Sequence, residues 1–309
     1  MKVFLTGPTG FVGNAIFHTL VENGFDMVAL VRHPESAAQL GEKCEVVVGD
    51  MREPASWKEY AAQCDIAIHA AQQSMGFPIT ESAVDATVEA DRLAVEGLLD
   101  AFRQGARLKK LIYTSGLWSY GDCGDEWVDE NFPYRPVGIN LRRAEREKVL
   151  FEIAAKERLH VCSMVLGNVY GPGASFRGYV ERARRGEHKF IGGGSNFMSP
   201  IHFRDVGTAY LAALRTGRGG ERYNICDSQP IRAAEHAALL CQSVGSAPPE
   251  SLPFDAAEKI LGKLHATSLV RSIRMKNTKA MNELGWKPTF PTFACGVKAS
   301  IADLLNQEN

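Results

Sequence analysis

The 309-residue sequence lacks the signals of several protein classes. Lys and Arg number 35 and Asp and Glu 36, so neither sign of charge is in excess. A balanced chain of this kind is not expected to have nucleic acid or an anionic membrane as its main partner. No apolar run is long enough to cross a bilayer, and the first apolar stretch soon gives way to Gly-Pro-Thr-Gly, unlike a signal peptide. We therefore expect a cytoplasmic protein.

Metal-binding and disulfide patterns are also missing. The seven cysteines are scattered, none of them forms a CxxC pair, and no HExxH occurs. A structural zinc site, a disulfide framework and the commonest zinc-hydrolase signature are therefore not expected, and we predict no metal site.

Short runs rich in Val and Ile alternate with longer segments of helical period in the first half of the chain. The expected buried strands are residues 3–6, 27–31, 45–48, 66–69, 111–114 and 160–166, and the expected helices include residues 11–23, 83–104 and 141–156. Alternation of strand and helix predicts an α/β fold, a doubly wound parallel (Rossmann) sheet with helices on both faces. After residue 173, Gly and Pro become denser and the elements shorter, which indicates a smaller C-terminal lobe.

Three glycines spaced GxxGxxG stand between the first expected strand and the first expected helix. Such glycines allow a tight turn, a close approach of the backbone to a pyrophosphate, and close packing of helix on strand. The helix N-terminus offers free N–H groups and the positive end of its dipole to the phosphates. A plain tight turn is the alternative. The predicted dinucleotide-binding residues here are Gly7, Thr9, Gly10, Phe11, Val12 and Gly13.

The residue that follows the second strand bears on the choice of dinucleotide. NAD sites usually place an Asp or Glu there for the ribose hydroxyls, whereas this chain has Arg32. A guanidinium suits a 2′-phosphate, so we predict NADP(H) in preference to NAD(H), with a plain surface arginine as the alternative. Asp50, Ala70 and Ala71 follow the third and fourth strands, where such a sheet borders the adenine and ribose. Helix capping by Asp50 and plain packing of the alanines are the alternatives.

Seven segments, in order, resemble motifs of the extended short-chain dehydrogenase/reductase family, which includes NAD-dependent epimerases/dehydratases and dihydroflavonol-reductase-like proteins. They are TGPTGFVG at 6–13, GDMR at 49–52, HAA at 69–71, NVYGPG at 168–173, IHFRDV at 201–206, YNI at 223–225 and ELGWKP at 283–288. The resemblance implies a sheet of about seven strands that takes in a late helix and strand near residues 204–225. It implies a dinucleotide-binding domain of residues 1–166 with 201–226, and a substrate-binding lobe of residues 167–200 with 227–309. It also adds Met51, Leu166 and Asn168 to the expected cofactor-binding residues.

In the short-chain dehydrogenase/reductase family that this chain resembles, the active site transfers a proton with the help of a Ser or Thr and of a Tyr and a Lys spaced YxxxK. That spacing is absent here. Counted from Glu147, the family's Tyr position falls on Ile139 and its Lys position on Arg143. Arg143 keeps a positive charge that could hold the nicotinamide ribose, whereas Ile139 cannot move a proton. The hydroxyl position falls on Gly116, with Ser115 one place earlier.

Three interpretations stay open. The first is a reductase of a carbonyl or conjugated double bond that uses another donor, for which Tyr120, Tyr134 and Tyr170 are candidates. The second is an epimerase, dehydratase or cyclase that retains its cofactor, and the third is a non-catalytic NADP(H)-binding sensor or scaffold. We favour the reductase, with Ser115, Tyr120, Tyr134 and Arg143 as the candidate catalytic residues.

The expected substrate is a small hydrophobic molecule. The residues that could line its cleft are Trp118, Trp127, Phe132, Tyr134, Phe176, Tyr179, Phe197 and Met198. A sugar nucleotide would instead use arginines near its diphosphate, for which Arg177, Arg182, Arg184 and Arg185 are available. In the resembling family the helices corresponding to residues 83–104 and 141–156 often form a dimer interface, so we also expect a possible homodimer. Its contacts would involve Leu93, Leu98, Phe102, Leu150 and Phe151.

Overall fold

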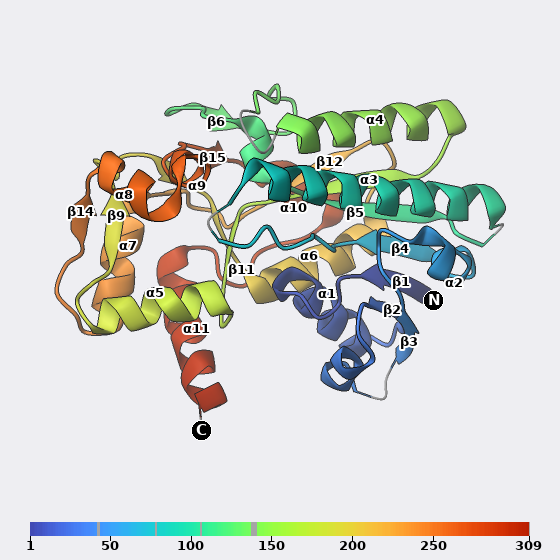
Figure 1. Ribbon diagram of the computed structural model, residues 1–309, viewed down its shortest axis with the longest axis horizontal. Coiled ribbons are helices and arrows are strands. Elements are labelled where there is room, and N and C mark those ends of the chain that lie inside the picture. Colours follow the sequence, from blue (N-terminus) through green and yellow to red (C-terminus); the bar gives the residue numbers. More distant parts are fainter. Residues whose placement is uncertain (42–43, 78, 106, 137–140, 309) are drawn as a thin grey trace.

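The computed structural model describes residues 1–41, 44–77, 79–105, 107–136 and 141–308. Its centre is a seven-stranded sheet in which every neighbouring pair is parallel, in the order β12-β7-β5-β4-β1-β2-β3 (Figure 1). The strands are β1 (Lys2–Thr6), β2 (Asp26–Val31), β3 (Cys44–Val48), β4 (Ile66–His69), β5 (Lys110–Gly116), β7 (Val161–Leu166) and β12 (Arg222–Ile225). The predicted doubly wound α/β fold is therefore confirmed.

Helices cover both faces of the sheet because its central strands are apolar on both sides. Along β1, Val3 and Leu5 are buried in one core and Phe4 in the other. The first core is closed by α1 (Phe11–Glu22), α6 (Phe203–Thr216) and α10 (Thr278–Leu284), and the second by α2 (Lys58–Ala62), α3 (Glu81–Gln104) and α4 (Leu141–Glu157). Figure 1 shows α3 and α4 on one side of the sheet and α1 and α6 on the other.

The order of the strands places a crevice beside β1. The chain runs from β1 through β2 to the edge strand β3, and then returns to β4 on the other side of β1. The connections on the two sides therefore diverge at the carboxyl ends of β1 and β4. In open parallel sheets this switch point is where ligands bind.

Most of the smaller lobe follows β7 in the chain and lies beyond the carboxyl ends of the sheet strands (Figure 1). Its helices are α5 (Ala174–Arg184), α7 (Ala233–Ser243), α8 (Phe254–Leu261), α9 (Lys263–Leu269) and α11 (Phe293–Glu308). Its short strands pair as β8 (Asn168–Tyr170) with β11 (Pro200–His202), β9 (Lys189–Ile191) with β14 (Glu250–Leu252), β10 (Phe197–Met198) with β13 (Ile231–Arg232), and β6 (Trp127–Val128) with β15 (Arg274–Met275). The division into two domains at the stated boundaries stays a proposal. Within residues 227–309, α10 packs against α6 and β12 of the sheet lobe.

The helices expected at a dimer interface, α3 and α4, lie side by side, and Arg103 of α3 pairs with Glu157 of α4 at 2.8 Å. Leu98 and Leu150 are buried in the core beneath these helices, so they are not free to contact a second copy. The homodimer stays a prediction. No helix in the described ranges is both long and apolar enough to cross a membrane.

Candidate functional site

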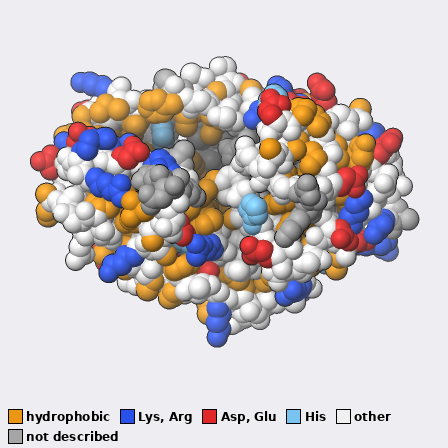
Figure 2. Space-filling view, turned by 90° about the horizontal axis from the view of Figure 1, so that it is seen from below, with side chains coloured by type: hydrophobic (Ala, Val, Ile, Leu, Met, Phe, Trp, Pro, Cys, Tyr) orange, Lys and Arg blue, Asp and Glu red, His pale blue; other side chains and the backbone are white. Residues whose placement is uncertain are grey.

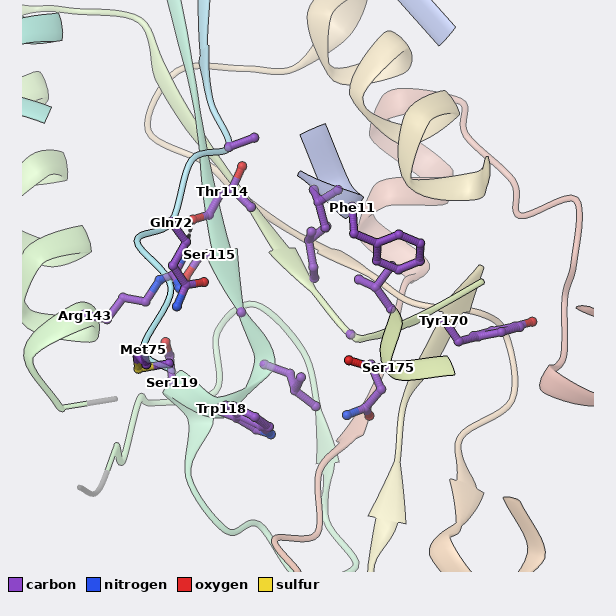
Figure 3. A pocket seen from close by; sticks show the side chains of 18 of the residues that line it. Phe11, Gln72, Met75, Thr114, Ser115, Trp118, Ser119, Arg143, Tyr170 and Ser175 are labelled. Carbon is purple, nitrogen blue, oxygen red and sulfur yellow. Dashed lines mark hydrogen bonds between the residues drawn. The ribbon is translucent and has the colours of Figure 1, made fainter. Parts of the chain in front are cut away.

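A cavity of about 640 Å³ lies at the carboxyl ends of β1, β4, β5 and β7. Figure 2 shows the molecule hollowed between its two lobes on this face. The cavity is lined from the sheet lobe by Phe11, Val12, Ala70 and Ser115 and from the smaller lobe by Tyr170, Phe176 and Met198, among others (Figure 3). It therefore occupies the switch point at which the fold places a ligand.

The glycine loop between β1 and α1 has the geometry that a dinucleotide needs. Gly7 has a φ of +71°, and a Cβ there would lie 2.7 Å from the Cα of Ala71. A Cβ on Gly13 would collide with the carbonyl oxygen of Gly7. Gly10 is the N-cap of α1, no side chain caps this helix, and its first turn holds no acidic residue. The loop is thus closely packed, and the helix N-terminus beside it is free to receive a phosphate group.

The side of the site next to β2 and β3 carries two arginines and a carboxylate. Arg52 binds Asp50 through two hydrogen bonds of 2.9 and 2.7 Å, which hold the pKa of Asp50 below its ordinary value. The charge of Arg32 acts on Asp50 in the same direction, so Arg32 lies on this side too. Arg32 is exposed, and its side chain makes no hydrogen bond to any residue that the structure describes. Met51 is buried in the core next to Asp50.

A chain of hydrogen bonds holds the segment after β4 in place. Thr6 Oγ accepts the N–H groups of Ala70 and Ala71 at 3.2 and 3.1 Å, and it lies 2.8 Å from Nδ1 of His69. The other ring nitrogen of His69 lies 3.3 Å from Asp91. These contacts are satisfied together if Thr6 donates to Nδ1 and the Nε2–H of His69 donates to Asp91. Sequence reasoning placed the two alanines but missed Thr6 and His69, although both belong to the motif segments.

Asp91 is a carboxylate at the wall of the cavity. Burial would raise its pKa, but the hydrogen bond from His69 and the charge of Arg143 hold it below its ordinary value. The hydroxyl of Tyr113 also donates to Asp91 at 3.1 Å. Asp91 is therefore a fixed negative charge facing Arg143.

Arg143 reaches from α4 to the end of β5 and lines the cavity (Figure 3). Its Nη2 donates to the carbonyl of Thr114 at 2.9 Å and its Nη1 to the side-chain oxygen of Gln72 at 3.2 Å. Its Nε is buried and has no partner among the residues described. The guanidinium is therefore fixed by two bonds while a donor remains unused.

Ser115 is the other polar group at the end of β5. Its hydroxyl donates to Glu147 at 2.8 Å, and Tyr134 donates to the same oxygen at 3.0 Å. Glu147 is 1% exposed, and its second carboxylate oxygen has no partner in the described part of the chain. Sequence reasoning used Glu147 only as a landmark, yet it fixes the orientation of Ser115.

The three candidate tyrosines differ in position. Tyr120 and Tyr134 do not line the cavity: Tyr120 donates to Asn224 at 2.7 Å, and burial raises the pKa of both. Tyr170 lines the cavity, but its hydroxyl is buried and its ring packs against Phe293. Ile139, at the family's Tyr position, lies outside the described residues.

The remaining predicted residues divide between the cavity and the surrounding structure. Those that line it are Leu166, Asn168, Trp118, Phe176, Tyr179 and Met198. Trp127, Phe132 and Phe197 do not line it, nor do the four arginines considered for a sugar nucleotide, all of which are described. The arginine that does line it besides Arg143 is Arg146, three residues further along α4. That spacing on one helix face was a signal that could have identified it.

Residues 3–226 match the family model described as the NAD dependent epimerase/dehydratase family. The chain therefore belongs to this family. It is 28% identical over 311 residues to a 3-diazoavenalumate denitrifying reductase of Streptomyces sp, covering 96% of this chain and 99% of that protein. It is 26% identical to a 4-hydroxy-2-methyl-3-oxo-4-farnesyl-3,4-dihydroquinoline-1-oxide ketoreductase of Stigmatella aurantiaca, covering 93% and 92%.

Solved structures share the fold at lower identity. A UDP-glucose 4-epimerase of Thermotoga maritima, solved with UDP-glucose, superposes with a TM-score of 0.84 at 21% identity and covers 100% of this chain and 99% of that one. A human epimerase family protein solved with NADPH gives a TM-score of 0.82 at 20% identity and covers 98% and 100%.

Proposed function

We propose that the protein is an NADP(H)-dependent reductase of a carbonyl or conjugated double bond in a small, largely hydrophobic molecule. The observation that carries the proposal is a cavity that is lined by Arg143 together with apolar side chains and that borders the start of α1 at Phe11 and Val12. Relatives named as reductases, aligned over more than nine-tenths of this chain, support the reaction class. The NADPH-bound structure of a human family member supports the cofactor class.

Each part of a nicotinamide dinucleotide has a counterpart in the residues present. The glycine loop and the N-terminus of α1 would hold the diphosphate, Arg32 the 2′-phosphate, and Arg143 the nicotinamide ribose. When bound, the reduced cofactor supplies a hydride. Arg143 positions and polarises the acceptor, but it cannot readily lose a proton and so does not relay one.

In this arrangement the hydroxyl of Ser115, at the end of β5, can act as a hydrogen-bond acceptor. The Ser115 hydroxyl donates its hydrogen bond to Glu147, so its oxygen lone pairs are free to accept from a donor group of the substrate or cofactor. Tyr120 and Tyr134 lie outside the cavity, and the hydroxyl of Tyr170 is buried, so the proposal takes the proton that completes the reduction from water. Acceptors that need little help from a fixed acid, such as a conjugated C=C, are therefore favoured over unactivated ketones.

The epimerase alternative has less support. Binding a sugar nucleotide calls for several cations near its diphosphate. The four arginines considered for that role, Arg177, Arg182, Arg184 and Arg185, do not line the cavity, which leaves Arg146 beside Arg143. A non-catalytic sensor or scaffold would bind NADPH and consume none of it. NADPH oxidation followed over a panel of carbonyl and enone compounds separates the proposed reductase from such a sensor or scaffold.

The cofactor preference is tested by titrating NADPH and NADH against wild type and Arg32→Ala. We expect the substitution to weaken NADPH binding about 10- to 150-fold, the worth of a charge-assisted phosphate contact, and to leave NADH binding nearly unchanged. Arg107→Ala is the matched control, because Arg107 is an exposed arginine paired with Asp65 just before β4, at the opposite end of the sheet. Equal losses for both cofactors would reject the 2′-phosphate contact.

A further inference from the structure

Two arginines of α4 face the same cavity. Arg143 and Arg146 are three residues apart, which places them on one face of the helix, and both line the cavity. In each of them Nε is buried and has no partner among the described residues. Buried guanidinium donors are normally hydrogen-bonded, so unused donors at a cavity wall indicate a missing acceptor.

The two arginines differ in how their charge is balanced. Arg143 faces the Asp91 carboxylate, whose pKa it helps to lower. The carboxylate whose pKa the charge of Arg146 lowers is Glu89, and Glu89 is already bound by Arg92 at 2.8 Å. Within the described ranges, Arg146 forms no salt bridge. Among the described residues, Arg146 therefore adds a positive charge to the cavity wall that no salt bridge neutralises.

Much of the cavity lining is apolar. Val84 and Val88 of α3 line the cavity together with Met75, Trp118 and Leu269. An apolar wall excludes water and strengthens the attraction between a cation and an anion. A ligand that fills this space with an apolar body and carries an acidic group would satisfy both features.

We propose that Arg146 is the anion-binding residue of the substrate site, and that the substrate is an apolar organic acid whose carboxylate, or another acidic group of the same charge, pairs with Arg146. The inference rests on the proposed function, because it assigns the substrate class of the same cavity. It separates the roles of the two arginines: Arg143 acts at the reacting group, and Arg146 holds the acidic end.

The test uses two fluorescent probes with the same aromatic body. 1-Anilinonaphthalene-8-sulfonate carries an anionic group, and N-phenyl-1-naphthylamine is its neutral counterpart. Each is titrated against wild type, Arg146→Gln, Arg146→Lys and Lys148→Gln. Lys148 is the matched control because it lies on the same helix with a side chain that is 77% exposed.

We expect Arg146→Gln to weaken binding of the sulfonate about 10- to 100-fold, the range for a charge-assisted hydrogen bond, while binding of the neutral probe stays unchanged. Arg146→Lys retains the charge and should restore much of the affinity, and Lys148→Gln should have no effect. Equal losses for both probes, no loss for the sulfonate, or the same loss in Lys148→Gln would overturn the proposal.

NADPH titration of the same samples separates this inference from the proposed function. If NADPH does not bind while the sulfonate effect is present, the anion site stands and the reductase proposal fails. If NADPH binds and is oxidised while Arg146→Gln leaves the sulfonate affinity unchanged, the reductase proposal stands and the anion site fails.

Discussion

At the scale of single residues, Arg143 has a geometry that a lysine could not reproduce. Its planar group donates to the Thr114 carbonyl and to Gln72 at the same time, which fixes both its position and its orientation. A lysine at this position would offer a point charge on a flexible stem. The difference suits a residue that positions and polarises without moving a proton.

Replacing Arg143 with Ala should lower turnover and weaken NADPH binding about tenfold, the worth of one or two hydrogen bonds. Arg143→Lys should retain part of the cofactor affinity but lose turnover, because one ammonium group cannot reproduce the planar guanidinium that bonds Thr114 and Gln72 at the same time. Fluorescence titration and steady-state NADPH oxidation measure the two effects. An NADPH dissociation constant that is the same in wild type and Arg143→Ala would remove Arg143 from the site.

The candidate catalytic residues differ in how well the sequence could predict their positions. Arg143 and Ser115 were identified by counting from motif residues, and the structure brings both to the cavity. Tyr120 and Tyr134 were identified only by their position in loops. Their hydroxyls are instead bonded to Asn224 and Glu147, contacts across 104 and 13 residues of chain that no local pattern encodes.

At the scale of elements, the predicted strands and helices of the sheet lobe agree with the structure to within about two residues, the usual uncertainty of such boundaries. Buried apolar runs between turn residues made them visible in the sequence. The largest differences are two residues: α3 begins at Glu81, and β5 extends to Gly116 because Ser115 and Gly116 pair with Val165 and Leu166 of β7. The short strands of the smaller lobe depend on pairing between distant segments, such as β9 with β14, and left no such signal.

The junction of β1 and α1 is the element on which cofactor binding depends, and Gly13→Ala tests it. The added methyl would collide with the Gly7 carbonyl oxygen, which belongs to the backbone and cannot rotate away. We expect a loss of about 1–3 kcal/mol of stability, the usual cost of overpacking, and weaker NADPH binding. Thermal unfolding and titration measure the two.

Gly193→Ala is the control for that experiment, because Gly193 is exposed and a Cβ there would have no neighbour within 4 Å. The stability and the NADPH affinity of the Gly193→Ala variant should match those of wild type. A Gly13→Ala protein with unchanged melting temperature and unchanged affinity would show that α1 can move away from the loop without cost.

At the scale of the whole molecule, two buried carboxylates lie where the lobes join. Asp205 of α6 accepts the N–H groups of Thr289 and Phe290 at 2.7 and 2.9 Å. Asp227 follows β12, accepts the N–H of Gln229 at 2.9 Å, and is 1% exposed. Its second carboxylate oxygen is buried without a partner in the residues described.

Burial raises the pKa of Asp227 to about 8, so its carboxyl group is protonated in the folded protein near neutral pH. In the unfolded chain the same group has its ordinary pKa of 3.8 and is ionised. The folded state therefore binds more protons than the unfolded state between these values, and stability falls as the pH rises through this range. Burial lowers the pKa of His202, also at this junction, to about 3, so its effect on stability lies below pH 6.5.

In the pH range from about 6.5 to 8 the effect of His202 is absent, and Asp227→Asn should flatten the stability profile there. One unit of pH is worth about 1.4 kcal/mol for a group that is protonated only when folded, so wild type should lose about 1–2 kcal/mol across the range. Asn keeps an oxygen to accept the Gln229 N–H but cannot ionise, and the variant should lose much less. Thermal unfolding at several pH values measures this, with Asp255→Asn as an exposed control that should follow wild type. Parallel profiles for wild type and Asp227→Asn would mean that Asp227 is already ionised in the folded protein, and that the junction of the lobes holds a buried negative charge at neutral pH.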